Sequence, residues 1–246
     1  MFTGVDNLWL FYSVLPIVAF LYAAVGHGGA SGYLALMVLF NFSPEYMKPT
    51  ALLLNLFVAG IAFIHYFKEG HFSWRLFLAF AIGSIPLAFF GGTFDIEASL
   101  YKKILGVLLI IAIARMLMQN SEDFQTKQLK WWQGVLIGAC IGFFSGLIGI
   151  GGGIILTPVI LLFHWGNMKE AAAVSALFIW VNSGAGILGL LTNGVTLEKE
   201  TFMCVGIAVI GGFFGSYYGS KKMKNKTLSY LLMFVLILAS AKLFFT

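Results

Sequence analysis

The sequence predicts an all-α, polytopic integral membrane protein. Of its 246 residues, 60% are hydrophobic and only 10% are charged, and a soluble domain cannot cover so much apolar surface with so few polar groups. A membrane-spanning helix takes about 20 apolar residues, so the chain has room for about nine to eleven of them. The composition therefore excludes a soluble enzyme and a nucleic-acid-binding protein.

Ten apolar segments separated by polar residues predict the helices in chain order. They lie near residues 8–25, 30–41, 49–67, 73–92, 99–118, 132–148, 153–163, 171–191, 201–219 and 228–245. The second and the seventh are conspicuously shorter than the others. No basic region precedes the first segment, so we expect it to remain as a helix and not to be cleaved as a signal peptide.

A polar stretch near the middle of the chain, QNSEDFQTKQLK at 119–130, divides these segments into two groups of five. Trp131 and Trp132 follow it, where aromatic anchors at a membrane interface are expected. The predicted organisation is therefore a first transmembrane repeat at 1–120, a polar linker at 121–130 and a second transmembrane repeat at 131–246.

The two halves resemble each other in sequence, which predicts a two-fold internal repeat of five segments. AVGHGGASGYLAL in the first half aligns with LIGIGGGIILTPV in the second. GSIPLAFFGG aligns with GGFFGSYYGS further along. The matching glycines of the first pair are Gly26, Gly28 and Gly29 with Gly149, Gly151 and Gly152.

The distribution of basic residues predicts that the second repeat is inverted. If all ten segments cross the membrane, one side collects ten Lys and Arg residues and the other side five. If each short segment merges with its predecessor, the division is seven against eight and carries no signal. The ten-crossing alternative satisfies the positive-inside rule and places both termini outside the cytoplasm. The ten basic residues on the Lys- and Arg-rich side are Lys68, Arg75, Arg115, Lys127, Lys130, Lys169, Lys221, Lys222, Lys224 and Lys226.

All ten carboxylates lie in predicted loops or at helix ends, so the predicted membrane core contains none. Proton pumps, sodium-coupled carriers of cations and intramembrane proteases place acidic residues or metal ligands inside their helices. We therefore expect no catalytic residue, metal or cofactor, and the low dielectric favours an anion where no negative charge repels it. Cys140 and Cys204 lie inside apolar segments and are interpreted as packing residues.

The glycine clusters at residues 26–32 and 149–153 are predicted to break their helices and to begin new ones. Free N–H groups at a helix start carry about half a positive charge. Short, glycine-interrupted segments at matching positions of two inverted halves indicate a midplane substrate site. The alternative is close helix packing through small residues.

Polar residues in or beside these breaks complete the predicted site. His27 is the ionisable residue of the first break, and it either binds the anion or carries a proton, or caps the broken helix as a neutral group. Asn55, Asn182 and their polar neighbours either donate to the anion or bond between helices. The predicted binding residues are His27, Gly28, Gly29, Ser31, Asn55, Gly151, Gly152, Gly153, Thr157, Ser175 and Asn182.

The chain resembles the TauE/SafE sulfite exporter family, also called toluene-sulfonate uptake permeases, over nearly its whole length. The resemblance rests on GHGGASGYLAL, GLIGIGGGIILTPVILL, AAAVSALFIWVNS and GGFFGSYYGSKKM. The first-half motif departs from the second, with Ala30 at the third glycine and Ala35 in place of the proline. The resemblance implies export or uptake of sulfite, sulfonates, sulfoacetate or thiosulfate across a bacterial inner membrane.

Residues and resemblance together predict a multi-pass secondary transporter of a small organosulfur or inorganic sulfur anion. Its partners are the anion and the lipid bilayer, with no nucleic acid, and co-transport of a proton and assembly into an oligomer are left open. Two alternatives are a passive anion channel and a membrane-embedded enzyme. The enzyme needs a nucleophile with a base, or a metal set, which the isolated His27 does not supply.

Overall fold

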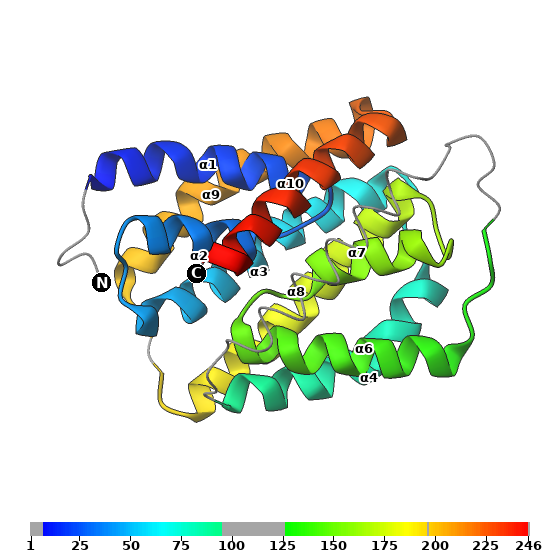
Figure 1. Ribbon diagram of the computed structural model, residues 1–246, viewed down its shortest axis with the longest axis horizontal. Helices are drawn as coiled ribbons and strands as arrows, with labels where there is room; N and C mark the ends of the chain where they lie inside the picture. Colours follow the sequence, from blue (N-terminus) through cyan, green and yellow to red (C-terminus); the bar gives the residue numbers. More distant parts are fainter. Residues whose placement is uncertain (1–6, 95–125, 196, 246) are drawn as a thin grey trace.

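The computed structural model describes residues 7–94, 126–195 and 197–245, and all regular structure in these ranges is helical. The helices lie along the length of an elongated bundle (Figure 1). They are α1 (Leu8–Ala24), α2 (Ala30–Leu39), α3 (Pro44–Lys68), α4 (Trp74–Thr93), α6 (Trp131–Ile148), α7 (Gly153–Leu162), α8 (Met168–Thr192), α9 (Lys199–Tyr217), a π-helical turn (Tyr218–Lys222) and α10 (Asn225–Phe245).

These helices confirm the predicted all-α membrane architecture. Five of them are long and apolar enough to cross a membrane, while α1, α2 and α7 are shorter. α3 and α8 begin five and three residues before their predicted starts, because their first turns carry charged residues that the apolar pattern assigns to loops. The predicted segment at 99–118 lies outside the described residues. The division into domains stays a prediction.

The centre of the bundle is the pair α3 and α8, which pack against each other. α9 covers α3 and itself packs against α1, while α4 covers α8 and packs against α6 (Figure 1). α8 is the most deeply buried of the five long apolar helices, because 72% of its apolar stretch is buried inside the protein. The polar residues Asn55 on α3 and Ser175, Asn182 and Ser183 on α8 are fully buried.

Backbone contact holds α6 against α4 through a glycine at every fourth position of α6. A β-carbon on Gly138, Gly142 or Gly146 would overlap the carbonyl oxygen of Phe80, Ser84 or Ala88, respectively. Small residues at this spacing allow membrane helices to approach closely. This stripe was not predicted from the sequence, in which glycine was taken as the sign of the breaks.

The same kind of contact joins α9 and the π-helical turn that follows it to α1. A β-carbon on Gly211, Gly215 or Gly219 would overlap the carbonyl oxygen of Pro16, Phe20 or Ala24. In both pairs the contacts advance together along the two chains, so the paired helices are parallel. Each pair combines the first helix of one predicted half with the fourth helix of the other, and the two halves are therefore interlocked.

The short helices α2 and α7 begin in the middle of the bundle. The carbonyl oxygen of Ala24, at the end of α1, accepts a hydrogen bond from Tyr66 near the end of α3. Gly28 lies against Asn55 at the middle of α3. From the end of α1, the chain therefore runs back to the middle of the bundle as non-helical backbone. α2 then completes the crossing. Ten residues of helix span about 15 Å, which is half of a bilayer core.

The residues between α6 and α7 also lie against α3. Gly149 follows α6 and lies against Lys48 at the start of α3, whereas Gly151 lies against Asn55. α1, α3 and α9 run one way along the bundle, and α4, α6 and α8 run the other way. This is the alternation that the ten-crossing count requires. The inverted repeat itself stays a prediction.

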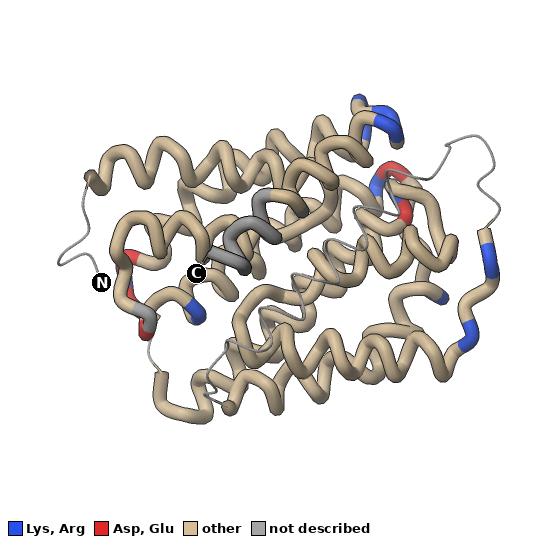
Figure 2. Tube along the Cα trace, viewed as in Figure 1, with Lys and Arg blue, Asp and Glu red and all other residues tan. Residues whose placement is uncertain are grey.

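Among the described residues, the charged ones gather toward the two ends of the bundle (Figure 2). Most of the Lys and Arg residues that the sequence assigns to one side lie at one end, where Lys221 pairs with Glu69 at 3.4 Å. At the same end, Lys169 donates to the carbonyl oxygen of Ser220 at 2.9 Å. Arg115 lies outside the described residues. The end rich in Lys and Arg is predicted to face the cytoplasm.

We predict that Gly142→Val destabilises the protein, because the new side chain would force α6 away from the backbone of α4. Overpacking of a close contact costs about 1–3 kcal/mol, which a lowered melting temperature in detergent would report. The control is Gly206→Val on the exposed face of α9, where a β-carbon meets nothing within 4 Å. Equal melting temperatures for the two variants would show that the glycine stripe does not limit the packing.

Candidate functional site

The two glycine breaks meet at the side chain of Asn55, which is fully buried at the middle of α3. The Asn55 Oδ1 atom accepts a hydrogen bond from the backbone N–H of Ala30, the first residue of α2, at 3.0 Å. A β-carbon on Gly151 would lie 2.6 Å from the Asn55 Nδ2 atom. One amide group therefore bonds the start of α2 through its oxygen and faces the second break through its nitrogen.

Both breaks need glycine for its backbone conformation as well as for space. Gly29 ends the first break with φ of 100°, while Gly151 and Gly152 have φ of 72° and 78°. These values lie in the left-handed region, which strains residues with a β-carbon. At Gly28 the backbone angles are ordinary, but a β-carbon would overlap the Asn55 Oδ1 atom.

His27 connects the first break to α7 and α8 through a buried chain of hydrogen bonds. Its Nε2 atom lies 2.9 Å from the Thr157 hydroxyl, and that hydroxyl donates to the Ser175 hydroxyl at 2.7 Å. Because Thr157 donates its hydrogen to Ser175, the bond to His27 requires a hydrogen on Nε2. In the neutral ring, Nδ1 is then an acceptor, and it has no hydrogen-bond partner among the described residues.

Several other buried polar atoms also lack a hydrogen-bond partner in the described part of the chain. Besides His27 Nδ1, they are Tyr33 OH, Asn55 Nδ2, Ser145 Oγ, Asn182 Oδ1 and Ser183 Oγ. An unpaired buried polar group costs about 1–3 kcal/mol, so most native structures contain few of them. All six lie in or beside the breaks or on the helices around them.

The structure brings only part of the predicted site together. Asn55, His27, Thr157 and Ser175 join the breaks as described above. Ser31 instead donates to the hydroxyl of Tyr22 on α1 at 2.9 Å.

Asn182 is bonded to its own helix, because its Nδ2 atom donates to the carbonyl oxygen of Phe178 at 2.8 Å. Ser145 and Ser183, which lie outside the predicted binding set, face the second break. The signal in the sequence was their spacing: Ser145 comes one helical turn before Gly149, and Ser183 follows Asn182.

Charged groups lie toward the ends of the bundle, and the side chain of Lys48 lies against Gly149, the first glycine of the second break. The carboxylates that the structure describes are all at least partly exposed and lie near helix ends, as predicted. Lys48 donates to the carbonyl oxygen of Phe94 at 3.4 Å, just beyond the end of α4. Lys169 similarly binds Ser220 beyond the end of α9. Both lysines thus stabilise carbonyl groups near helix ends.

The remaining histidines also lie away from the breaks. His65 Nδ1 lies 2.8 Å from the Ser216 hydroxyl and joins α3 to α9. Outside the spanning helices, burial lowers the pKa of His71, and the charge of Lys169 lowers it further. Among the described residues, no group of three or more His, Cys, Asp or Glu side chains is arranged to hold a metal ion.

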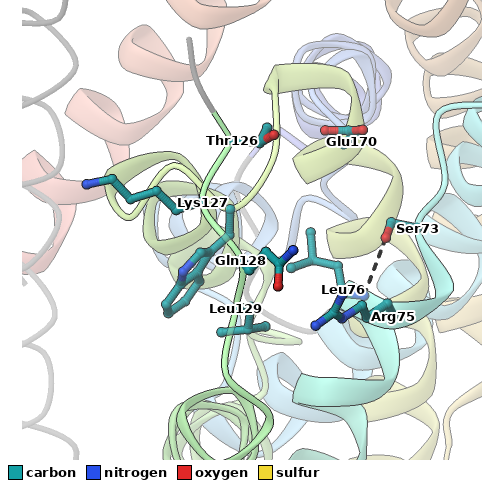
Figure 3. Close-up of a pocket in the computed structure, with 9 residues that line it drawn as sticks. Ser73, Arg75, Leu76, Thr126, Lys127, Gln128, Leu129 and Glu170 are labelled. Carbon is teal, nitrogen blue, oxygen red and sulfur yellow. Dashed lines mark hydrogen bonds between the residues drawn. The ribbon is translucent and has the colours of Figure 1, made fainter.

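A half-open cavity of about 200 Å³ lies at the Lys- and Arg-rich end of the bundle, away from the breaks. Its walls come from the start of α4, the segment before α6, and the connection from α7 into α8 (Figure 3). Arg75 and Lys127 contribute positive charge to it and Glu170 contributes negative charge. None of the predicted binding residues lines this cavity.

Comparison with known proteins gives a consistent set of relatives. The family model described as sulfite exporter TauE/SafE matches residues 13–243. A probable membrane transporter protein of Sinorhizobium fredii is 36% identical, over 92% of this chain and 94% of its own length. A probable membrane transporter protein of Methanocaldococcus jannaschii is 28% identical, over 74% of this chain and 73% of its own. No solved structure matches the chain.

We predict that Thr157→Val lowers the melting temperature in detergent, because it leaves His27 Nε2 and Ser175 without their shared partner. Each unpaired buried group costs about 1–3 kcal/mol. Thr157→Ser keeps the hydroxyl and should lie closer to the unmodified protein. Thr192→Val is the control, since Thr192 is exposed near the end of α8 and bonds only its own helix at Gly189. A Thr157→Val protein as stable as Thr192→Val would contradict the buried chain.

Proposed function

Because the chain belongs to the TauE/SafE sulfite exporter family, we propose that it is a secondary transporter that carries small sulfur-containing anions by alternating access. The family and the apolar helices make it a multi-pass membrane transporter of the bacterial inner-membrane type. The relatives are named as transporters and not as enzymes. The convergence of both glycine breaks on Asn55, with unpaired buried polar atoms around them, carries the proposal.

The chemistry around the breaks suits an anion. Amide and hydroxyl groups donate hydrogen bonds without adding negative charge, and the first turns of α2 and α7 leave backbone N–H groups without an intrahelical partner. Each helix start adds about half a positive charge. No carboxylate among the described residues lies in the core to repel an anion. A small oxyanion in this place would be stabilised by fixed dipoles, without any buried cation.

Alternating access would use the glycine-packed pairs as rigid bodies. In α1 with α9, and in α4 with α6, the backbones are in contact, so neither pair can change its internal geometry easily. The breaks, by contrast, are non-helical and lie between the pairs. Rocking of one pair against the other around Asn55 would expose the breaks to each side of the membrane in turn.

The test of this proposal is a panel of anions on the purified protein. We expect sulfite, thiosulfate or a sulfonate such as sulfoacetate to raise the melting temperature, whereas sulfate and aliphatic carboxylates should do so less. Stabilisation by carboxylates alone would refute the sulfur assignment. In proteoliposomes, concentrative uptake under a proton gradient is expected, whereas uptake that never exceeds the equilibrium level would indicate a passive channel.

His27 is the group proposed to carry a coupled proton. In its neutral form it donates through Nε2 to Thr157, and Nδ1 carries the lone pair that a proton would occupy. A proton there would place a positive charge beside the second break, because Thr157 belongs to α7. A bound anion and this proton would then stabilise each other, which is the physical basis of co-transport.

We predict that binding of an aliphatic sulfonate, whose charge does not change between pH 5 and 8, strengthens as the pH falls. The reason is that protonation of His27 adds a positive charge in the low-dielectric core. His27→Gln keeps a side chain that donates hydrogen bonds but cannot be protonated, so its sulfonate affinity should not depend on pH. Isothermal titration calorimetry at several pH values measures the sulfonate affinity of both proteins. If the sulfonate affinity of His27→Gln depends on pH in the same way as that of the unmodified protein, His27 does not carry a coupled proton.

A further inference from the structure

We infer that the head group of the anion binds at the second glycine break alone, among buried donors from Asn55, Ser145 and Ser183 at the start of α7. The first break then serves as a fixed support. This inference rests on the proposed function and sharpens it, because the binding residues predicted from the sequence are distributed over both breaks. It assigns Ser145 and Ser183, which the predicted set omits, as binding residues.

The hydrogen-bonding groups of the first break are largely bonded within the protein. The Ala30 N–H is bonded to Asn55, and the His27 N–H donates to the carbonyl oxygen of Tyr22 at 2.9 Å. The His27 ring is bonded to Thr157. A β-carbon on Gly26 would overlap the carbonyl oxygen of Ala172, so this backbone is also wedged against α8.

The second break is surrounded by donors that have no partner among the described residues. The Asn55 Nδ2 atom lies 2.6 Å from the position of a β-carbon on Gly151, and the Ser183 Oγ atom lies 3.0 Å from it. The Ser145 β-carbon lies 3.4 Å from the equivalent position on Gly152. All three side chains have 0% exposure. They come from α3, α8 and α6, and they converge on the residues that begin α7.

The chemistry of one amide group explains why the two breaks differ. Asparagine has a carbonyl oxygen that accepts and an NH₂ group that donates. The bond from the Ala30 N–H fixes the oxygen of Asn55 toward α2, so the NH₂ group must face the second break. The corresponding residue of the other half, Asn182, bonds its own helix through Phe178. The first break therefore receives no amide donor in return.

The resulting donor set defines the class of ligand. The Asn55 NH₂ group offers two hydrogens, and the Ser145 and Ser183 hydroxyls offer one each. They suit a head group with several acceptor oxygens on one atom, such as sulfite or the sulfonate group of an organic sulfonate. No carboxylate among the described residues lies near enough to pair with an ammonium group, so we expect a zwitterion such as taurine to bind more weakly than a simple sulfonate.

The experiment compares substitutions at the two breaks by isothermal titration of the full-length protein with sulfite and with an aliphatic sulfonate. Asn55→Asp keeps an oxygen for the Ala30 N–H but replaces the NH₂ group with a second carboxyl oxygen, which offers at most one hydrogen, and only in the protonated acid. We expect this variant to bind the anion at least tenfold more weakly than the unmodified protein. Ser183→Ala removes one donor to a charged ligand and should raise Kd by about tenfold or more.

The matched control is Tyr33→Phe, which removes an unpaired, fully buried hydroxyl beside Gly29 of the first break. Its Kd should stay within about twofold of the unmodified protein, because a neutral hydroxyl at the fixed break makes no contact with the head group. Weakening by Tyr33→Phe equal to that by Ser183→Ala would overturn the single-break site. So would unaltered binding by both Asn55→Asp and Ser183→Ala.

The outcomes separate this inference from the proposed function. If the unmodified protein binds no sulfur anion, the proposed function fails and the inference fails with it. If the unmodified protein binds sulfite and the substitutions at the second break have no effect, only the inference fails. Should Asn55→Asp not fold, Ser183→Ala and Tyr33→Phe decide the question by themselves.

Discussion

The hydrogen bonds of the peptide backbone constrain this structure more than any other interaction. Inside a membrane an unpaired N–H or C=O group finds no water, so a chain that leaves helical geometry must be satisfied by the protein itself. Here both breaks in the helical bundle are placed around one side chain. Asn55 bonds the N–H that begins α2 and presents its other face to the residues before α7. Central burial of α3 and α8 follows from this requirement, because only a surrounded helix can carry such a group.

Close packing of glycines against the backbone of a neighbouring helix holds the bundle rigid around the two crossings that the glycine breaks interrupt. α6 packs against α4, and α9 packs against α1. The carbonyl oxygens of α4 and α1 occupy the positions that β-carbons on the glycines of α6 and α9 would need. Because each pair joins the first helix of one predicted half to the fourth helix of the other, the predicted halves cannot separate without breaking both contacts. Glycine therefore has two separate tasks in this chain, since it permits left-handed backbone at the breaks and close approach along the helices.

Much of the fold could be predicted from the sequence, because membrane burial acts on each segment separately. Apolar length determined where helices such as α1, α4 and α6 lie, and the exclusion of charge from the apolar runs determined which residues lie at the ends of the bundle. The early starts of α3 and α8 were not predicted, because the first turns of these helices are polar and lie outside the apolar segments. The glycines of α6 were visible at every fourth position, but their partner helix was not.

For the candidate site, the residues by themselves determined the chemistry, and only the tertiary structure decided the geometry. The sequence placed glycine clusters, His27 and Asn55 in an apolar core without carboxylates, which is enough to favour an anion. It could not decide that Asn55 would bond to Ala30 while Asn182 turned back to its own helix, because the two asparagines are in similar sequence settings. That choice depends on which helix start lies within hydrogen-bonding distance. It is therefore a property of packing between segments far apart in the chain.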